Sequence, residues 1–138
     1  MRRAFLLLAL LPVPALAQEA SPPDLVGSWT GTFQAILVGA TPYRPSEGTG
    51  ASFADTEIPY TVEFTEQKGG RLAGTISAGD HTETLIGALM PPEYTSGTLV
   101  DDDGSYRFSV RDAATIDFCY GHNLPDSRAV ACGTVTRE

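Results

Sequence analysis

Basic residues are scarce in this sequence. Only 9 lysines and arginines stand against 17 aspartates and glutamates among 138 residues, which gives a formal net charge of −8. Such an acidic chain is repelled by the phosphates of nucleic acids and by anionic membrane surfaces. We therefore expect no nucleic-acid partner, whereas a small molecule or a protein partner remains compatible with this charge.

Long hydrophobic runs are also missing. The clearest apolar run covers residues 4–11, far below the roughly 20 residues that span a bilayer. Two arginines precede it and Ala15-Leu16-Ala17 follows it, the small-x-small pattern of a signal peptidase site. The pattern predicts a signal peptide over residues 1–17 cut after Ala17, a flexible segment over 18–24, and one domain over 25–138. We expect a periplasmic or secreted protein without membrane insertion.

The expected mature chain has 121 residues, enough for one domain with its own core. Arg2 and Arg3 leave with the signal peptide, so 7 basic and 17 acidic residues remain, a net charge of −10.

Cysteine is nearly absent, and the two that occur, Cys119 and Cys132, are expected to form a disulfide in an exported protein. Both lie in alternating segments that flank the turn-rich residues 122–127. A hairpin with these two residues opposite each other sets its register, because paired residue numbers must sum to 251. Phe118 then faces Gly133, and Tyr120 faces Ala131. A Cys-x-x-Cys redox motif is missing, so the bridge is expected to be structural.

Helical stripes with caps are missing as well, whereas alternation of apolar and polar residues is frequent. Short turns rich in glycine and aspartate separate the alternating pieces. The sequence therefore predicts an all-β domain of eight strands, near residues 25–38, 57–66, 71–78, 81–89, 94–100, 105–111, 114–120 and 129–136.

Eight consecutive strands joined by short turns predict an antiparallel up-and-down barrel, with a two-sheet β-sandwich as the alternative. The exception to the short turns is the stretch 39–56, a long loop rich in small and turn residues, of a length that is usually functional or disordered. The inward faces of strands 81–89 and 94–100 are not evident from the pattern.

In such a barrel the first, third, fifth and seventh turns meet at one end, the mouth. Three inward tyrosines are expected near this end, and inward phenylalanines are expected deeper. This arrangement is typical of a small-molecule site, although tyrosines also gather wherever a core meets water, and small barrels also fill with side chains. The predicted ligand-binding residues are Tyr60, Tyr106, Tyr120, Phe33, Phe64, Phe108, Phe118, Tyr43 and His122.

The only tryptophan, Trp29, lies in Gly27-Ser28-Trp29 on the first strand, and Arg137 on the last strand is placed to stack on it. Together with eight strands and a long first loop, these residues resemble the calycin superfamily of lipocalin- and avidin-type barrels. The resemblance implies that Trp29 and Arg137 close one end and that the interior binds a small, mostly apolar ligand. The helix that follows a lipocalin barrel is missing, and so is a match to the polar biotin-binding residues of avidin.

Signals for other chemistry are weak. Two histidines and several aspartates are expected near the mouth, but their spacing is not that of a metal site, and Asp101-Asp102-Asp103-Gly104 lacks the later ligands of a calcium loop. A Gly-x-Ser-x-Gly elbow is missing. We therefore expect neither an enzyme nor a cofactor or metal. The function predicted is the binding of a small apolar or aromatic molecule. The alternative is a protein-binding module, such as an inhibitor or envelope accessory factor, that acts through residues 39–56.

Overall fold

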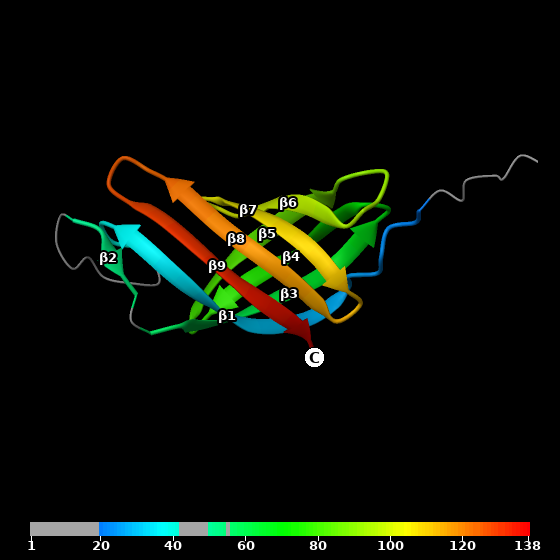
Figure 1. Cartoon of the computed structure of the whole chain (residues 1–138), viewed down its shortest axis with the longest axis horizontal. Coiled ribbons are helices and arrows are strands. Elements are labelled where there is room, and N and C mark those ends of the chain that lie inside the picture. Colours follow the sequence, from blue (N-terminus) through cyan, green and yellow to red (C-terminus); the bar gives the residue numbers. More distant parts are fainter. Residues whose placement is uncertain (1–19, 42–49, 55) are drawn as a thin grey trace, which may run out of the picture.

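The chain folds into strands alone over the part that the computed structural model describes, residues 20–41, 50–54 and 56–138 (Figure 1). The predicted signal peptide, its cleavage site and Tyr43 lie outside the described residues. The strands are β1 (Gly27–Val38), β2 (Ser52–Phe53), β3 (Ile58–Lys68), β4 (Arg71–Ala78), β5 (His81–Leu89), β6 (Ser96–Val100), β7 (Ser105–Asp112), β8 (Thr115–Asn123) and β9 (Arg128–Arg137).

Eight of these strands close into an antiparallel up-and-down barrel, as predicted. Each of β3 to β8 pairs with the next strand along the chain, and β1 pairs with both β3 and β9. The closing ladder between β1 and β9 runs without a break from Trp29↔Arg137 to Val38↔Arg128. The β-sandwich alternative is therefore wrong, because the first and last strands complete one continuous wall.

The stretch 39–56 contains a short strand that we did not predict. In β2, Phe53 pairs with Ile36 and Ser52 pairs with Leu37 of β1. This pairing is possible because the ladder between β1 and β3 ends at Phe33↔Ile58, which leaves the following edge of β1 open for β2. The edge of a strand offers unpaired backbone groups that a neighbouring segment can satisfy.

Several predicted strand ends are off by two or three residues. The first strand begins at Gly27 instead of residue 25, because the glycine has a φ of 131° that turns the chain into the barrel. The buried Leu25 before it donates its backbone N–H to the side chain of Gln67. The strand β3 continues to Lys68 instead of ending at residue 66, and Lys68 pairs with Arg71 across a two-residue turn. In β8 the ladder reaches Asn123.

The core follows the predicted alternation, which is interrupted by a β-bulge after Phe64 in β3 and another after Val110 in β7. The register also settles the faces of the two strands that the pattern left open: Glu83, Leu85 and Leu89 of β5 and Leu99 of β6 are buried. The cluster of buried apolar residues comprises Leu25, Trp29, Phe33, Val62, Phe64, Leu72, Ile76, Leu85, Leu89, Leu99, Tyr106, Phe108, Ile116, Phe118, Ala131 and Val135.

One end of the barrel, which we call the floor, is closed by Trp29 and Arg137. The indole is fully buried and donates its Nε1–H to the carbonyl oxygen of Leu25 at 3.0 Å. The guanidinium lies over the indole, 4.4 Å from the ring centroid, within the range of a cation–π contact. Its nitrogens also donate to the carbonyl oxygens of Asp24 and Val26, so Arg137 ties the last strand to the segment before the first.

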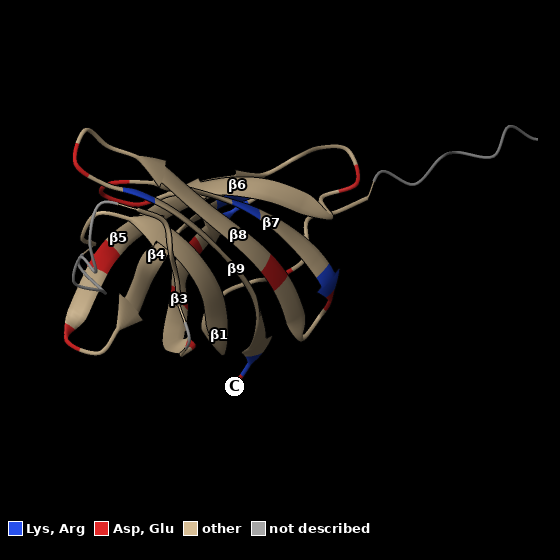
Figure 2. Ribbon diagram, turned by 60° about the vertical axis from the view of Figure 1, so that its left-hand side comes forward, with Lys and Arg blue, Asp and Glu red and all other residues tan. Residues whose placement is uncertain are grey.

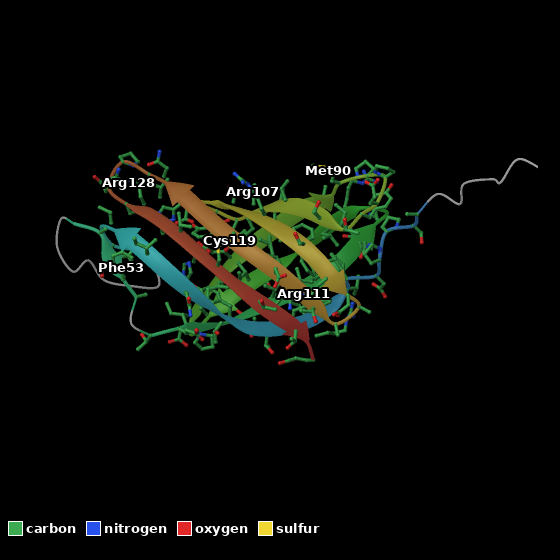
Figure 3. All side chains as sticks on the ribbon, in the orientation of Figure 1. Phe53, Met90, Arg107, Arg111, Cys119 and Arg128 are labelled. Atoms are coloured by element: carbon green, nitrogen blue, oxygen red, sulfur yellow. A yellow bond between two sulfur atoms is a disulfide. The ribbon has the colours of Figure 1, made fainter. Side chains whose placement is uncertain are left out.

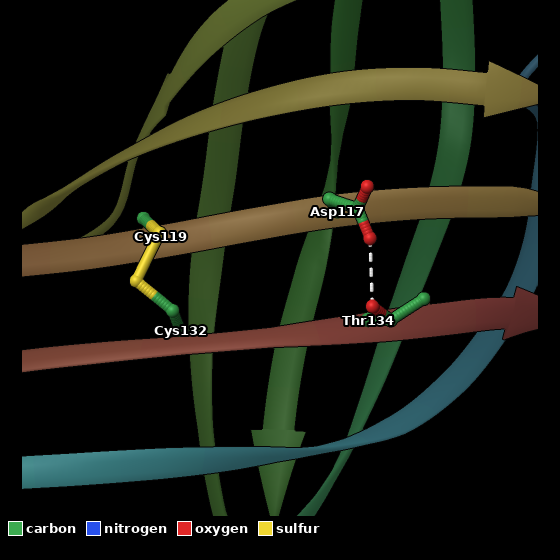
Figure 4. Close-up of a disulfide and its surroundings, with 4 residues drawn as sticks. All are labelled: Asp117, Cys119, Cys132 and Thr134. Atoms are coloured by element: carbon green, nitrogen blue, oxygen red, sulfur yellow. Dashed lines mark hydrogen bonds between the residues drawn. A yellow bond between two sulfur atoms is a disulfide. The ribbon is translucent and has the colours of Figure 1, made fainter.

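The hairpin of β8 and β9 carries the predicted disulfide between Cys119 and Cys132 (Figure 4). Their pairing has the predicted register, with Phe118 opposite Gly133 and Tyr120 opposite Ala131. The bridge lies on the outside of the wall, and Cys119 is among the labelled side chains on the outer surface in Figure 3. Each cysteine is thus next in sequence to a residue of the inner face.

Among the described residues, no helix is long and apolar enough to cross a membrane.

Candidate functional site

Four aromatic side chains gather at the end of the barrel opposite the floor, the mouth, where β1, β4, β6 and β8 end. Phe33 of β1 and Tyr60 of β3 have ring centroids 4.7 Å apart, and so do Tyr106 of β7 and Tyr120 of β8. The second pair arises from register, because Tyr106 and Tyr120 are direct cross-strand partners on the inner face. We call these four rings the aromatic collar.

The collar borders a small cavity of about 40 Å³. Small side chains on β9, the strand next to β8, help to leave this space: Ala131 pairs with Tyr120, and Ala129 pairs with His122. A cavity of this volume has room for about three water molecules and is well below the roughly 300 Å³ of pockets for drug-sized ligands. Its lining comprises Phe33, Ala35, Leu37, Thr41, Ile58, Tyr60, Asp103, Tyr106, Tyr120, His122, Ala129 and Ala131.

The structure thus brings five of the predicted ligand-binding residues to one cavity: Phe33, Tyr60, Tyr106, Tyr120 and His122. It does not bring the other described ones there, because Phe64, Phe108 and Phe118 lie in the packed core and do not line the cavity. Phe118 stacks on Phe108 with ring centroids 5.8 Å apart. These deeper rings fill the barrel, so the cavity occupies the mouth alone.

A chain of hydrogen bonds crosses the cavity wall from β8 to the two neighbouring turns. The Tyr120 hydroxyl donates to Oδ1 of Asp103 at 2.5 Å and lies 2.8 Å from Nδ1 of His122. Since that hydroxyl hydrogen is directed at the carboxylate, the phenol oxygen accepts from Nδ1–H. Nε2 of His122 then faces the hydroxyl of Ser127 at 3.2 Å. His122 is buried, so this chain holds its ring in one orientation.

The charge state of Tyr120 follows from its surroundings. Burial is the largest cause that raises the pKa of this phenol, followed by the hydrogen bond to Asp103 and the nearby charges of Asp101, Asp103 and Glu83. Tyr120 therefore stays neutral and acts as a hydrogen-bond donor.

Three carboxylates converge beside the collar. Oxygens of Glu83, Asp101 and Asp103 lie within 4.8 Å of one another, close enough to surround a cation. Asp101 also accepts from the Tyr106 hydroxyl at 2.7 Å and from the backbone N–H of Gly104. Nε2 of His81 lies 3.1 Å from Glu83, so this histidine belongs to the same cluster.

Glu83 is the site residue that the sequence analysis missed. It is a buried carboxyl group, and it faces the interior beside the collar. The signal was the tight turn before it: a two-residue reversal at residues 79–80 pairs Ala78 with His81 and therefore Ile76 with Glu83. Cross-strand partners share a face, so the apolar Ile76, which is buried in the core, places Glu83 on the inner face as well.

Comparison of the chain with protein-family models, with curated proteins and with solved structures gives no match. The closed antiparallel barrel is compatible with a calycin-like fold.

Proposed function

We propose that this chain is an exported protein that binds a compact apolar or aromatic molecule, or one compact group of a larger molecule, at the mouth of the barrel. The single observation that carries the proposal is the cavity bordered by the aromatic collar. Concave sites with mostly apolar walls and a few placed polar groups are typical of small-molecule binding. The disulfide supports export, because such bonds persist in oxidising compartments.

The proposed role is binding and not catalysis. Deeper phenylalanines pack the interior, so a ligand would enter only as far as the collar, with Tyr106 and Tyr120 on one side and Phe33 and Tyr60 on another. The membership of the chain in the calycin superfamily is part of this proposal, and the floor closed by Trp29 and Arg137 supports it.

The test is native mass spectrometry of the protein isolated from its own periplasm or culture fluid, with a search for a bound small mass. We expect each of the variants Tyr60→Ala, Tyr106→Ala and Tyr120→Ala to bind that molecule with an affinity at least about tenfold lower. The reason is that an aromatic side chain contributes on the order of 1–3 kcal/mol to such a contact. Tyr94→Ala is the matched control, because Tyr94 packs beside Gly70 at the floor end. Equal retention in all four folded variants would contradict the proposal.

A second candidate function, the binding of another protein, is favoured by a specific observation on the outer wall. Phe53 of β2 is 74% exposed and Val130 of β9 is 54% exposed, and both line one outer groove with Ile36. Large apolar groups this exposed are typical of interaction surfaces when they lie together. Phe53 belongs to the stretch 39–56 through which this alternative was predicted to act. A co-purifying protein chain that is lost in Phe53→Ser, together with the lack of any bound small mass, would support this candidate over the first.

A further inference from the structure

The mouth combines two features that are individually common and are informative together: aromatic rings around a cavity, and concentrated negative charge beside them. Asp103 lines the cavity itself, and the oxygens of Asp101 and Glu83 lie within 4.8 Å of its carboxylate. The turns at this end add Asp80 and Asp126, and Figure 2 shows Asp and Glu in red on several turns as well as on strands of the barrel.

We propose that the cavity receives a small organic cation, a methylated ammonium group that inserts between the rings of the aromatic collar beside Asp103. The inference rests on the proposed function and names the class of ligand for that same cavity. An ammonium group with methyl substituents presents an apolar surface that carries a positive charge. Rings of tyrosine and phenylalanine attract such groups through their negative faces, and aromatic cages with a nearby carboxylate are suited to them.

The polar contacts around the cavity favour a cation over an anion. Tyr120 donates its hydroxyl hydrogen to Asp103, and Tyr106 donates its hydroxyl hydrogen to Asp101. Both hydroxyl hydrogens are therefore already engaged by carboxylates and do not serve as donors to an anionic ligand. Histidines lie within ion-pair distance of this cluster: His122 is 3.9 Å from Asp103, and His81 is 3.1 Å from Glu83. An anionic ligand would meet repulsion from this cluster.

The apolar part of the lining distinguishes a methylated ammonium from a hydrated metal ion. Ala35, Leu37, Ile58 and Ala129 line the cavity and offer no oxygen ligand from their side chains. Calcium and magnesium take six or more oxygen ligands, and stripping their water against such walls is unfavourable. Methyl groups pack well against the same side chains. The volume of about 40 Å³ also favours one compact head group, with the rest of a larger ligand outside the mouth.

The test is a titration of the purified full-length protein, followed by NMR or calorimetry, with choline and with its uncharged carbon analogue 3,3-dimethylbutan-1-ol. The two probes have nearly the same shape and differ in charge. We expect choline to bind at least about tenfold more tightly, as a cation–π contact beside a carboxylate implies. Asp103→Asn keeps the shape of the side chain and an oxygen that accepts from Tyr120, and should remove most of this preference.

Asp102→Asn is the matched control, because Asp102 lies on the same turn, is exposed and has no role in the cavity lining. It should leave the binding of both probes unchanged. Asp101→Asn provides a second charge-removing variant if Asp103→Asn fails to fold by circular dichroism.

The outcomes separate the inference from the proposed function. Equal binding of the two probes at the cavity would overturn the cation and leave a small-molecule site in place. Binding of neither probe would also overturn the inference, and the native mass spectrum then decides the proposed function by itself. Saturable binding of calcium ions, tested with calcium chloride, and no response to choline would overturn the inference. That result would indicate a metal site at Glu83, Asp101 and Asp103 instead.

Discussion

Asp117 illustrates how a single surface carboxylate links neighbouring strands on the outer wall of this barrel. It accepts a hydrogen bond from Thr134 of β9 at 2.6 Å, drawn in Figure 4, and it forms a two-pronged contact with Arg111 of β7. The hydrogen bond from Thr134, followed by that from Arg111, holds the pKa of Asp117 below its usual value. One side chain on β8 thus joins both of its neighbours.

The lowered pKa makes a prediction about pH. A carboxylate with a lower pKa in the folded state stabilises the fold above the pKa of the unfolded chain, and this stabilisation is lost as the pH falls through the folded value. We expect Asp117→Asn to lower the free energy of unfolding by about 0.5–1 kcal/mol near neutral pH, since the side chain is 39% exposed and solvent screens the pair. Urea unfolding at about pH 7 and about pH 2.5 should show the difference shrinking in acid. A constant difference would contradict this account, and Asp102→Asn serves as the control.

Trp29 represents the opposite case, a residue whose contribution comes from burial. Replacing it with alanine should lower the free energy of unfolding by about 3–5 kcal/mol, because it removes a large core side chain and leaves a cavity beneath Arg137. Equilibrium denaturation followed by circular dichroism measures the loss. Phe53→Ala is the matched aromatic control, since Phe53 is largely exposed. A similarly small loss of unfolding free energy in both variants would contradict the stabilising role of the Trp29 indole at the floor.

At the scale of elements, the hairpin of β8 and β9 matters most for the site, because it carries Tyr120, His122, Ala129 and Ala131 of the cavity lining. Its disulfide lies outside the cavity but immediately adjoins Tyr120 and Ala131 in sequence. The bridge therefore braces the part of the wall that shapes the mouth.

Removing this bridge should be costly. Cys119→Ser combined with Cys132→Ser should lower the free energy of unfolding by about 3 kcal/mol, the expected effect of a crosslink that closes a short loop. A dithiol reductant should produce a comparable loss in the unmodified protein, measured by urea unfolding, and should have no effect on the double variant. An unchanged unfolding midpoint in the variant would refute the stabilising role.

Element by element, the sequence was most informative where alternation and turns agreed. The strand order and the inward tyrosines could be predicted, because apolar residues at every second position and short turns define both faces of a strand. The face of β5 could not be read from alternation, since Leu85 and Ile86 are neighbours and both are apolar. The strand β2 was missed because two residues are too few to show a period.

For the molecule as a whole, closure depends on close approach of the first and last strands. Gly133 of β9 pairs with Phe33 of β1, and a Cβ at this glycine would overlap with the ring of Phe33 and the carbonyl oxygen of Thr32. The barrel can close here only because that side chain is missing. The same glycine opposes Phe118 on its other side, so two rings share the space above it.

We expect Gly133→Ala to destabilise the protein by about 1–3 kcal/mol, because the added methyl group forces the two strands apart. Hydrogen exchange should then become faster along both β1 and β9, since their shared ladder is disturbed. Gly50→Ala is the control: a Cβ at Gly50 meets no atom within 4 Å, and we expect a change within about 0.5 kcal/mol. An unchanged free energy of unfolding in Gly133→Ala would contradict the requirement for close approach of β1 and β9 at this position.

The size of the cavity is the whole-molecule property that the sequence did not predict. It depends on how the rings of Phe118 and Phe108 pack below the collar and on the small side chains of Ala35, Ala129 and Ala131 in the lining, which no local pattern specifies. Five residues of the predicted site line the cavity, and the phenylalanines expected below them complete the core.

The sole tryptophan in the sequence lies at the floor, remote from the collar and shielded from solvent. Its ultraviolet emission is consequently a built-in optical reporter of one end of the molecule. Occupancy of the opposite end should leave the emission wavelength unchanged, whereas unfolding should shift it to the red. A fluorescence measurement on one sample can thus distinguish a compound that denatures the protein from one that binds at the mouth.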